Sequence, residues 1–437
     1  MKSFLYETSK RKIRQRAIVV GIHKKSEKQE HEFEWLSEIK SLCRTAGARV
    51  VGQLSQIVEH YNPATMIGSG KVQELAELVG QQHADIVVFD AILSPSQQVN
   101  LEKRLAKQVI DRPAVILDIF AIHAKTREAK AQVELAQLQY ILPRLAGGWT
   151  HLERQEGAIG TRGPGETQLE TDRRLVHKRI GDLKKKLVEI EGERQIQRKG
   201  RLELFNVCLV GYTNAGKSTI FNKLTGENVV AEDYLFATLD STTRRVKLSG
   251  KNEVLLSDTV GFIKRLPVSL VASFKSTLLE AREADLLLHV IDISDDNFEE
   301  QIATVNGILD EIGCRGIPVL PLFNKIDRRN DPDLFRQLLQ CYPGSRFISA
   351  TSGEGINKLK SELQDYLEKS QVIILAKIAD GGNDKFGRLS SWAQIIDSTI
   401  VDGVIQIRAK LPKSHLGKLK SEGIEFVVVK DQRGPQG

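Results

Sequence analysis

The chain has 437 residues, of which 41% are hydrophobic and 27% charged. This composition is ordinary for a globular protein, and the length predicts about three domains. No apolar run approaches the roughly 18 residues of a membrane span, and the short apolar run near the basic N-terminus is no signal peptide, so we expect a cytoplasmic protein without membrane contact. Four scattered cysteines argue against a disulfide framework and a zinc site.

The net charge of +7 is unevenly distributed along the chain. Residues 1–205 hold 34 Lys and Arg against 26 Asp and Glu, so the remainder is close to neutral. Eleven basic and four acidic residues lie between Arg173 and Arg201 alone. Two interpretations stay open for this segment: a solvated helix surface, or a surface that contacts the phosphate backbone of a nucleic acid.

Strand-like runs alternate with helical patterns in residues 1–145, which predicts an N-terminal α/β domain. The runs are 17–22, 48–54 and 86–90. Residues 111–142 then predict largely one long helix, beginning after Pro113. In this domain the run from Gly68 to Lys71 opens a helix, and it is either a turn or helix cap or part of a second nucleotide site.

A glycine-rich passage and a basic helical segment follow in residues 146–203. The passage contains Gly147, Gly148, Gly157, Gly160, Gly163 and Gly165. Residues 166–199 are helical in pattern, with few apolar positions among many charges. Such a narrow apolar stripe predicts a two-helix arm or helical hairpin that projects from the protein, with its leucines packed between the two helices.

Residues 204–370 show the strand and helix alternation of a doubly wound sheet, in which ligands bind at the ends of strands. Residues 371–437 predict a small C-terminal α+β domain with one helix near 415–420. Its strand candidates are 372–377, 392–396, 404–407 and 426–429. The fold class is therefore α/β, with an N-terminal α/β domain, a projecting helical arm, a doubly wound domain and a C-terminal α+β domain.

The run from Gly211 to Ser218 fits the phosphate-binding loop GxxxxGK[ST] and follows a buried strand. Backbone N–H groups of such a loop surround phosphates at a helix N-terminus. We expect Lys217 to reach the outer phosphates and the Ser218 hydroxyl to coordinate Mg²⁺.

Two further motifs fit loops that respond to the terminal phosphate. Thr238 is our choice for a second hydroxyl ligand of Mg²⁺, with Thr242 and Thr243 as alternatives. Asp258 begins a DxxG pattern at the end of an apolar strand, where it would hold Mg²⁺ through water. The Gly261 amide would contact the γ-phosphate and lose that contact on hydrolysis.

The base is identified by the run from Asn324 to Asp327. The Asp327 carboxylate can accept paired hydrogen bonds from guanine N1 and N2, whereas adenine offers no such pair. The Ala350 amide can in turn donate to guanine O6. The predicted ligands are therefore GTP and GDP with Mg²⁺, and the reaction is hydrolysis of GTP to GDP and phosphate.

Two residues depart from the pattern of Ras-like enzymes. Phe262 follows Gly261 where those enzymes have a glutamine that orients the attacking water, so we expect slow hydrolysis by the protein alone and stimulation by a partner. Asn214 either stabilises the phosphate loop or holds a K⁺ ion near the β- and γ-phosphates.

The candidate site residues come from all of these motifs. Those for the nucleotide are Gly211, Tyr212, Thr213, Asn214, Ala215, Gly216, Lys217, Ser218, Phe236, Ala237, Thr238, Leu239, Asp240, Asp258, Thr259, Val260, Gly261, Asn324, Lys325, Ile326, Asp327, Ser349, Ala350 and Thr351. The metal candidates are Ser218 and Thr238, and the candidates for the catalytic step are Lys217, Gly261 and Phe262.

The chain resembles the HflX family of translational GTPases. The runs 68–71, 131–138 and 160–174 carry the resemblance, together with the guanine-nucleotide motifs. It implies a mostly monomeric cytoplasmic protein that binds the 50S subunit, splits or rescues stalled 70S ribosomes, and reaches toward the peptidyl-transferase region with the basic arm. Two alternatives stay open: an RNA-remodelling ATPase that uses 68–71, and a GTP-gated module for a non-ribosomal partner.

Overall fold

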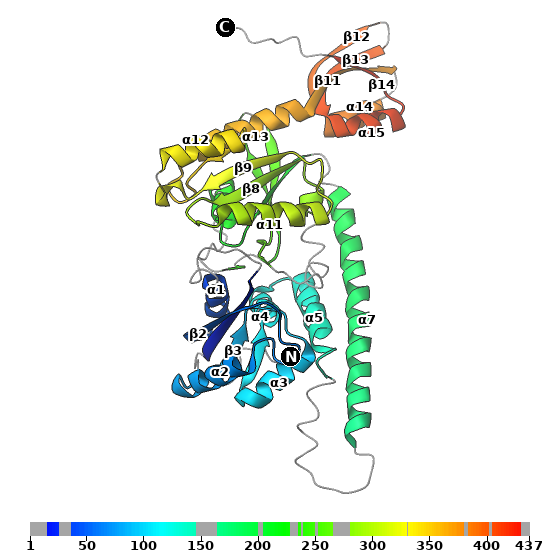
Figure 1. The fold of residues 1–437 in the computed structure, drawn as a ribbon. Helices are drawn as coiled ribbons and strands as arrows, with labels where there is room; N and C mark the ends of the chain where they lie inside the picture. Colours follow the sequence, from blue (N-terminus) through cyan, green and yellow to red (C-terminus); the bar gives the residue numbers. More distant parts are fainter. Residues whose placement is uncertain are drawn as a thin grey trace.

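Three β-sheets follow one another along the computed structural model, and a long helix lies beside the N-terminal domain (Figure 1). The structure describes residues 15–25, 36–145, 164–199, 204–227, 235–236, 239–249, 252–264, 280–329, 331–379, 383–401 and 404–429. Most of the glycine-rich passage, residues 237–238 and the C-terminal tail lie outside these ranges. The predicted α/β fold class is confirmed, with an N-terminal α/β domain, a helical region, a central domain with a mixed sheet and a C-terminal domain with an antiparallel sheet.

The N-terminal sheet is parallel and has the order β2-β1-β3-β4. The strands are β1 (Arg16–Lys24), β2 (Arg49–Val58), β3 (Ile86–Phe89) and β4 (Gln108–Asp111). Helix α1 (Ser37–Thr45) covers one face, and α2 (Ser69–Gln81) and α3 (Pro95–Leu105) cover the other. The central strands are buried on both faces, which explains their continuous apolar runs.

The run from Gly68 to Lys71 begins helix α2. Gly68 is the N-cap of this helix, and the Lys71 ammonium pairs with Glu74 one turn later, at 2.8 Å. The prediction of a helix cap is therefore confirmed.

Residues 111–142 form two helices, so the prediction of one long helix is wrong. Helix α4 (Arg112–His123) ends before Thr126, and α5 (Arg127–Ile141) begins after it. The Thr126 backbone is extended and its hydroxyl accepts a hydrogen bond from Ala129 N at 3.0 Å, which starts a new helix. Apolar periodicity continues across this break because both helices are buried, and it therefore concealed the cap.

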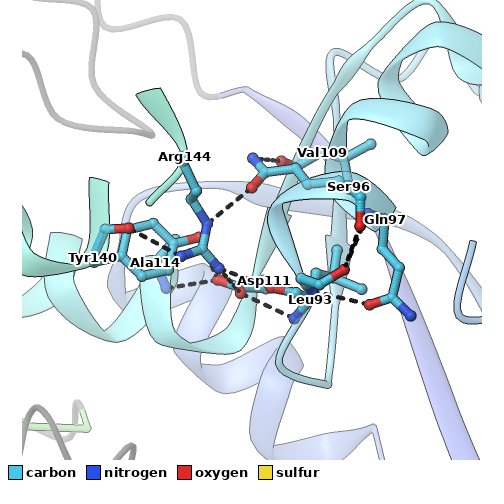
Figure 2. Close-up of polar contacts among 10 residues, drawn as sticks. Leu93, Ser96, Gln97, Val109, Asp111, Ala114, Tyr140 and Arg144 are labelled. Atoms are coloured by element: carbon cyan, nitrogen blue, oxygen red, sulfur yellow. Dashed lines mark hydrogen bonds and ion pairs between the residues drawn. The ribbon is translucent and has the colours of Figure 1, made fainter. Parts of the chain in front are cut away.

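Asp111 joins α5 to the end of strand β4 (Figure 2). Its buried carboxylate accepts hydrogen bonds from Tyr140 Oη at 2.7 Å and from Arg144 at 3.1 Å, and also from the backbone N–H groups of Leu93 and Ala114. Burial raises the pKa of Asp111, whereas these donors lower it. The C-terminal end of α5 is thus held against the N-terminal sheet.

The basic segment is a single helix, α7 (Pro164–Lys199), and not the predicted hairpin. It runs beside α5, as Figure 1 shows, with Ile180 and Leu183 buried against α5. Arg179 makes a bidentate ion pair with Glu134 of α5, with distances of 2.7 and 2.9 Å. The sparse apolar stripe fits one neighbouring helix, and that neighbour comes from the N-terminal domain and not from the arm itself.

The central sheet has the order β10-β9-β8-β5-β7-β6, with only β6 antiparallel. Its strands are β5 (Phe205–Gly211), β6 (Thr242–Lys247), β7 (Glu253–Asp258), β8 (Leu286–Asp292), β9 (Val319–Asn324) and β10 (Arg346–Phe347). Helices α8 (Lys217–Thr225) and α13 (Ile356–Ser370) cover one face, and α11 (Phe298–Glu311) packs on the other. Helix α12 (Pro332–Cys341) packs near β9, beyond the short 3₁₀ turn Ile326–Arg328.

The C-terminal sheet is antiparallel, in the order β12-β13-β11-β14. Its strands are β11 (Gln371–Ala379), β12 (Gln394–Val401), β13 (Val404–Pro412) and β14 (Glu425–Val429). Besides the predicted helix, α15 (Leu416–Ser421), there is a second one, α14 (Asn383–Trp392), which was not predicted. It ends just before β12, the strand expected at 392–396. A short 3₁₀ turn, Lys413–His415, leads into α15. Across the described residues, none of the helices has the length and apolar character needed to cross a membrane.

Candidate nucleotide-binding site

The predicted nucleotide motifs meet at one edge of the central sheet. Each motif follows the carboxyl end of a parallel strand: 211–218 after β5, 258–261 after β7, 324–327 after β9 and 349–351 after β10. Phe236, Leu239 and Asp240 precede β6, whereas Ala237 and Thr238 lie outside the described residues. This is the edge at which doubly wound sheets bind ligands.

The phosphate loop has a backbone that depends on glycine. Gly211 (φ 148°) and Gly216 (φ 98°) lie in the left-handed region, and a Cβ at either position would come within 2.2 Å of a neighbouring atom. Asn214 also has a positive φ, 61°, and its side chain is exposed at the tip of the loop. The loop therefore keeps its N–H groups at the start of α8, where a phosphate binds.

Lys217 is buried inside this loop. Its ammonium donates to the carbonyl oxygens of Gly211 at 3.1 Å and Tyr212 at 2.7 Å. Burial lowers the pKa of Lys217 to about 8; nearby Asp258 raises it and Lys325 lowers it. The ammonium is thus an incompletely compensated positive charge that phosphate oxygens would stabilise.

Ser218 and Asp258 bring together two oxygen donors of the kind that Mg²⁺ prefers. The Ser218 hydroxyl donates to Asp258 Oδ2 at 2.7 Å, and the Asp258 side chain is almost completely buried. A hydroxyl and a carboxylate at the N-terminus of α8, beside the phosphate loop, fit a Mg²⁺ ion that is shared with phosphate oxygens. Thr238, the other predicted ligand, is outside the described residues, and the alternative Thr243 bonds Ser257 within the sheet at 2.8 Å.

Gly261 and Phe262 run directly beside the phosphate loop. Phe262 N donates to Gly211 O at 3.1 Å, and Thr213 N donates to Phe262 O at 2.8 Å. A Cβ on Gly261 would come within 2.9 Å of Lys217 Nζ. The Phe262 ring is buried in the core between the N-terminal and central sheets, so it presents no polar group to the phosphate loop.

Asn324 joins two loops of the site. Its amide nitrogen donates to Ala215 O at 2.8 Å, and its amide oxygen accepts from Ala350 N at 3.0 Å. Ser349 is fully buried, and its hydroxyl accepts a hydrogen bond from Ser352 N at 3.1 Å. Asn324 therefore fixes the phosphate loop relative to the loop at 349–351.

Asp327 and Lys325 lie in the turn that follows Asn324. The Asp327 side chain is exposed, as a group that binds a base must be before binding. Lys325 has a positive φ of 66°, and its ammonium pairs with Asp292 at 2.6 Å. Sequence reasoning did not select Asp292, although its position at the end of β8, next to β9, is a signal that could have found it.

The N-terminal domain contacts the site at two places that sequence reasoning missed. Asp240 accepts hydrogen bonds from the backbone N–H groups of Lys125 and Thr126, at 3.0 and 3.2 Å, and from the Thr126 hydroxyl at 2.5 Å. The Tyr212 hydroxyl donates to Glu38 of α1. Both contacts join residues that are more than one hundred positions apart in the chain, and no local sequence pattern predicts them.

Three family models match the chain in consecutive segments. A model described as "GTP-binding GTPase N-terminal" matches residues 34–121, and one described as "GTP-binding GTPase Middle Region" matches 123–201. Residues 206–325 match the model "50S ribosome-binding GTPase". The segments cover the N-terminal sheet except β1, the helices α5 and α7, and most of the central sheet.

Similar proteins match over most of the chain's length. The GTPase HflX of Magnetococcus marinus is 44% identical over 89% of this chain and 90% of its own length. The GTPase HflX of Escherichia coli is 48% identical over 78% of this chain and 80% of its own. Among solved structures, a GTP-binding protein of Sulfolobus solfataricus in complex with GDP is 26% identical and covers 81% of this chain and 99% of its own, with a TM-score of 0.43.

Proposed function

The chain belongs to the HflX family of ribosome-associated GTPases and hydrolyses GTP, and from this premise we propose that it binds the 50S subunit and splits or rescues stalled 70S ribosomes in the cytoplasm. In this proposal the GTP form binds tightly and hydrolysis permits release, because a nucleotide shifts a binding equilibrium only through its different affinity for two states. The protein would act as a monomer.

The observation that carries the proposal is the exposed basic surface of α7. Lys184, Lys185 and Lys186 are exposed on this helix, while Ile180 and Leu183 hold its other side against α5. A rigid helix with consecutive lysines directed to solvent is suited to contact with the phosphate backbone of ribosomal RNA. The neighbouring GTPase domain would make ribosome binding depend on which nucleotide is bound.

Sedimentation tests this proposal. Purified ribosomes are mixed with the protein and a non-hydrolysable GTP analogue, and we expect co-sedimentation with 50S subunits and fewer 70S particles. Replacing Lys184, Lys185 and Lys186 by glutamate should weaken binding by about a hundredfold at moderate salt, because three phosphate contacts become repulsive. The matched control reverses three exposed charges on or beside α3: Lys103, Arg104 and Lys107.

The control variant should bind as the native protein does. If the native protein fails to sediment with 50S subunits, the ribosomal proposal is wrong. If the two triple variants bind equally well, α7 is not the contact surface.

We further propose that hydrolysis by the protein alone is slow. The Phe262 ring is buried and cannot orient a water molecule, so a partner must order the loops or supply the polar group. Bound Mg²⁺, held by Ser218 and by Asp258 through water, would neutralise charge on the phosphates. Single-turnover hydrolysis with and without 50S subunits measures the stimulation, and equal rates would contradict this part of the proposal.

Asn214 is our proposed ligand for a K⁺ ion. Its exposed side chain at the tip of the phosphate loop can reach an ion beside the β- and γ-phosphates, where positive charge stabilises the transition state. Hydrolysis should be faster in potassium than in sodium buffer, and Asn214→Ala should remove the difference. Equal rates in the two buffers would leave Asn214 with a purely structural role.

A further inference from the structure

We propose that Glu38, on helix α1 of the N-terminal domain, is a positioning residue for GTP hydrolysis and acts through Tyr212 of the phosphate loop. The two residues are 174 positions apart in the chain, yet the Tyr212 hydroxyl donates a hydrogen bond to Glu38 Oε1. The proposal concerns hydrolysis by the isolated protein and does not depend on ribosome binding.

Tyr212 makes polar contacts with several parts of the site. Its carbonyl oxygen accepts from Lys217 Nζ at 2.7 Å, and its hydroxyl oxygen accepts from Lys264 N at 2.9 Å. The same hydroxyl donates to Glu38. Because the Tyr212 side chain is buried, the two contacts of its hydroxyl hold the ring in one position between the phosphate loop and the segment after Gly261.

That segment carries the groups that respond to the γ-phosphate. A short parallel bridge joins Phe262 to the phosphate loop: Phe262 N donates to Gly211 O, and Thr213 N donates to Phe262 O. The Tyr212 hydroxyl extends this bridge by two residues, to Lys264. A displaced Tyr212 ring would therefore release the end of the segment that places the Gly261 amide.

Glu38 is itself held rigidly. Its Oε2 atom accepts a hydrogen bond from Arg112 at the start of α4, and Arg112 also pairs with Asp90 after β3, at 2.6 Å. Arg112 is only 2% exposed, so this pair of carboxylates is needed to compensate a buried charge. A carboxylate fixed in this way is suited to holding the Tyr212 hydroxyl at a constant position.

The test measures single-turnover GTP hydrolysis and GTP affinity for four variants of the full chain. Glu38→Ala and Tyr212→Phe should each lower the hydrolysis rate about tenfold with little change in GTP affinity, because a charge-assisted hydrogen bond is lost. The double variant should be no slower than Tyr212→Phe, because loss of the hydroxyl already removes the hydrogen bond to Glu38. Glu38→Gln keeps an acceptor for the tyrosine and should recover most of the rate.

Thermal unfolding separates positioning from folding. Glu59→Ala is the matched control, because Glu59 lies in the same domain in an exposed ion pair with Lys25. This variant should hydrolyse GTP at the native rate. Should Glu38→Ala fail to fold, Tyr212→Phe still tests the proposal, because it removes only a hydroxyl. The proposal would be overturned if the losses in hydrolysis rate from the two single variants multiplied in the double variant. It would also be overturned if either single variant hydrolysed GTP faster than the native protein, or had a lower Tm with an unchanged hydrolysis rate.

Discussion

Asn324 and Asp327 lie three residues apart in one motif, yet their surroundings assign them different tasks. Asn324 is buried and bonds backbone atoms of Ala215 and Ala350, whereas Asp327 is exposed in the turn beyond it. The first residue therefore supports the site itself, and the second is left available for a ligand. Substitutions at the two positions should separate stability from base selectivity.

Asn324→Ala should destabilise the central domain. Loss of both hydrogen bonds leaves Ala215 O and Ala350 N buried and unsatisfied, which costs about 1–3 kcal/mol for each group. We expect a lower Tm and weaker binding of both GTP and GDP, measured by thermal unfolding and fluorescence titration. A variant with native stability would contradict the bridging role of Asn324.

Asp327→Asn should instead change which base is bound. An amide can donate to the extra carbonyl oxygen of xanthine but no longer accepts both guanine donors. We expect GTP to bind at least about tenfold more weakly and XTP to bind better, with an unchanged Tm because the side chain is exposed. Competition between GTP and XTP measures this, and an unaltered preference for GTP would exclude Asp327 as the residue that reads the base.

The lowered pKa of Lys217 leads us to expect that GTP affinity depends on pH. The protonated ammonium binds phosphate, and burial lowers its pKa in the free protein to about 8. Bound phosphate favours the charged form and raises this pKa, so binding takes up a proton above pH 8. GTP affinity should be nearly constant from pH 7 to about 8 and then fall by up to about tenfold per pH unit.

Titration between pH 7.0 and 8.8 checks this dependence. Lys217→Ala should bind GTP more weakly, and its affinity should change little over the same pH range. If the native protein and Lys217→Ala responded to pH in the same way, the titrating group would lie elsewhere.

At the scale of elements, helix α5 begins at a contact with the nucleotide-binding domain. The Asp240 carboxylate accepts hydrogen bonds from Lys125 N and from Thr126, the N-cap of α5. A negative charge at a helix N-terminus is stabilising, typically by about 0.3–1 kcal/mol. Since α5 also packs against α7, Asp240 connects the loop before β6 with the basic helix.

Asp240→Ala should loosen the start of α5. We expect amide hydrogen exchange in residues 125–130 to accelerate by roughly tenfold, because the cap loses its charged acceptor. Asp295→Ala is the control, since Asp295 bonds only nearby groups within the central domain. Unchanged exchange in residues 125–130 would show that Thr126 alone caps the helix.

The sequence predicted the motifs at this edge of the sheet because they are local. The run from Gly211 to Ser218 needs particular residues at adjacent positions, and the strand before it is a short apolar run. The hairpin was predicted wrongly because a narrow apolar stripe on α7 specifies one neighbour without identifying it. The link between Glu38 and Tyr212 could not be predicted, because a lone glutamate on a helix has no pattern that indicates a distant partner.

At the scale of the whole molecule, the N-terminal and central domains share a hydrophobic core, whereas the C-terminal domain has its own. One hydrophobic cluster includes residues of both the N-terminal and the central domain, and the edge-to-face contact of Phe120 with Phe236, at 4.7 Å between centroids, crosses their boundary. The C-terminal domain has a separate cluster, composed of residues after 371. We therefore propose that the interface between the N-terminal and central domains contains much more apolar packing than the interface between the central and C-terminal domains.

Removing each terminal domain in turn tests this difference. A chain ending at residue 370 should keep the Tm of the central domain and its GTP affinity, because no member of the shared cluster is lost. A chain beginning at residue 204 exposes the half of that cluster around Val210 and Phe262, and a contiguous apolar surface of this kind favours aggregation. We expect its Tm to fall by at least about 10 °C, or the protein to precipitate. If instead the two truncated chains proved equally stable, the shared cluster would contribute little to folding, and contact between the N-terminal domain and the nucleotide loops would have to depend on the polar links at Glu38 and Asp240.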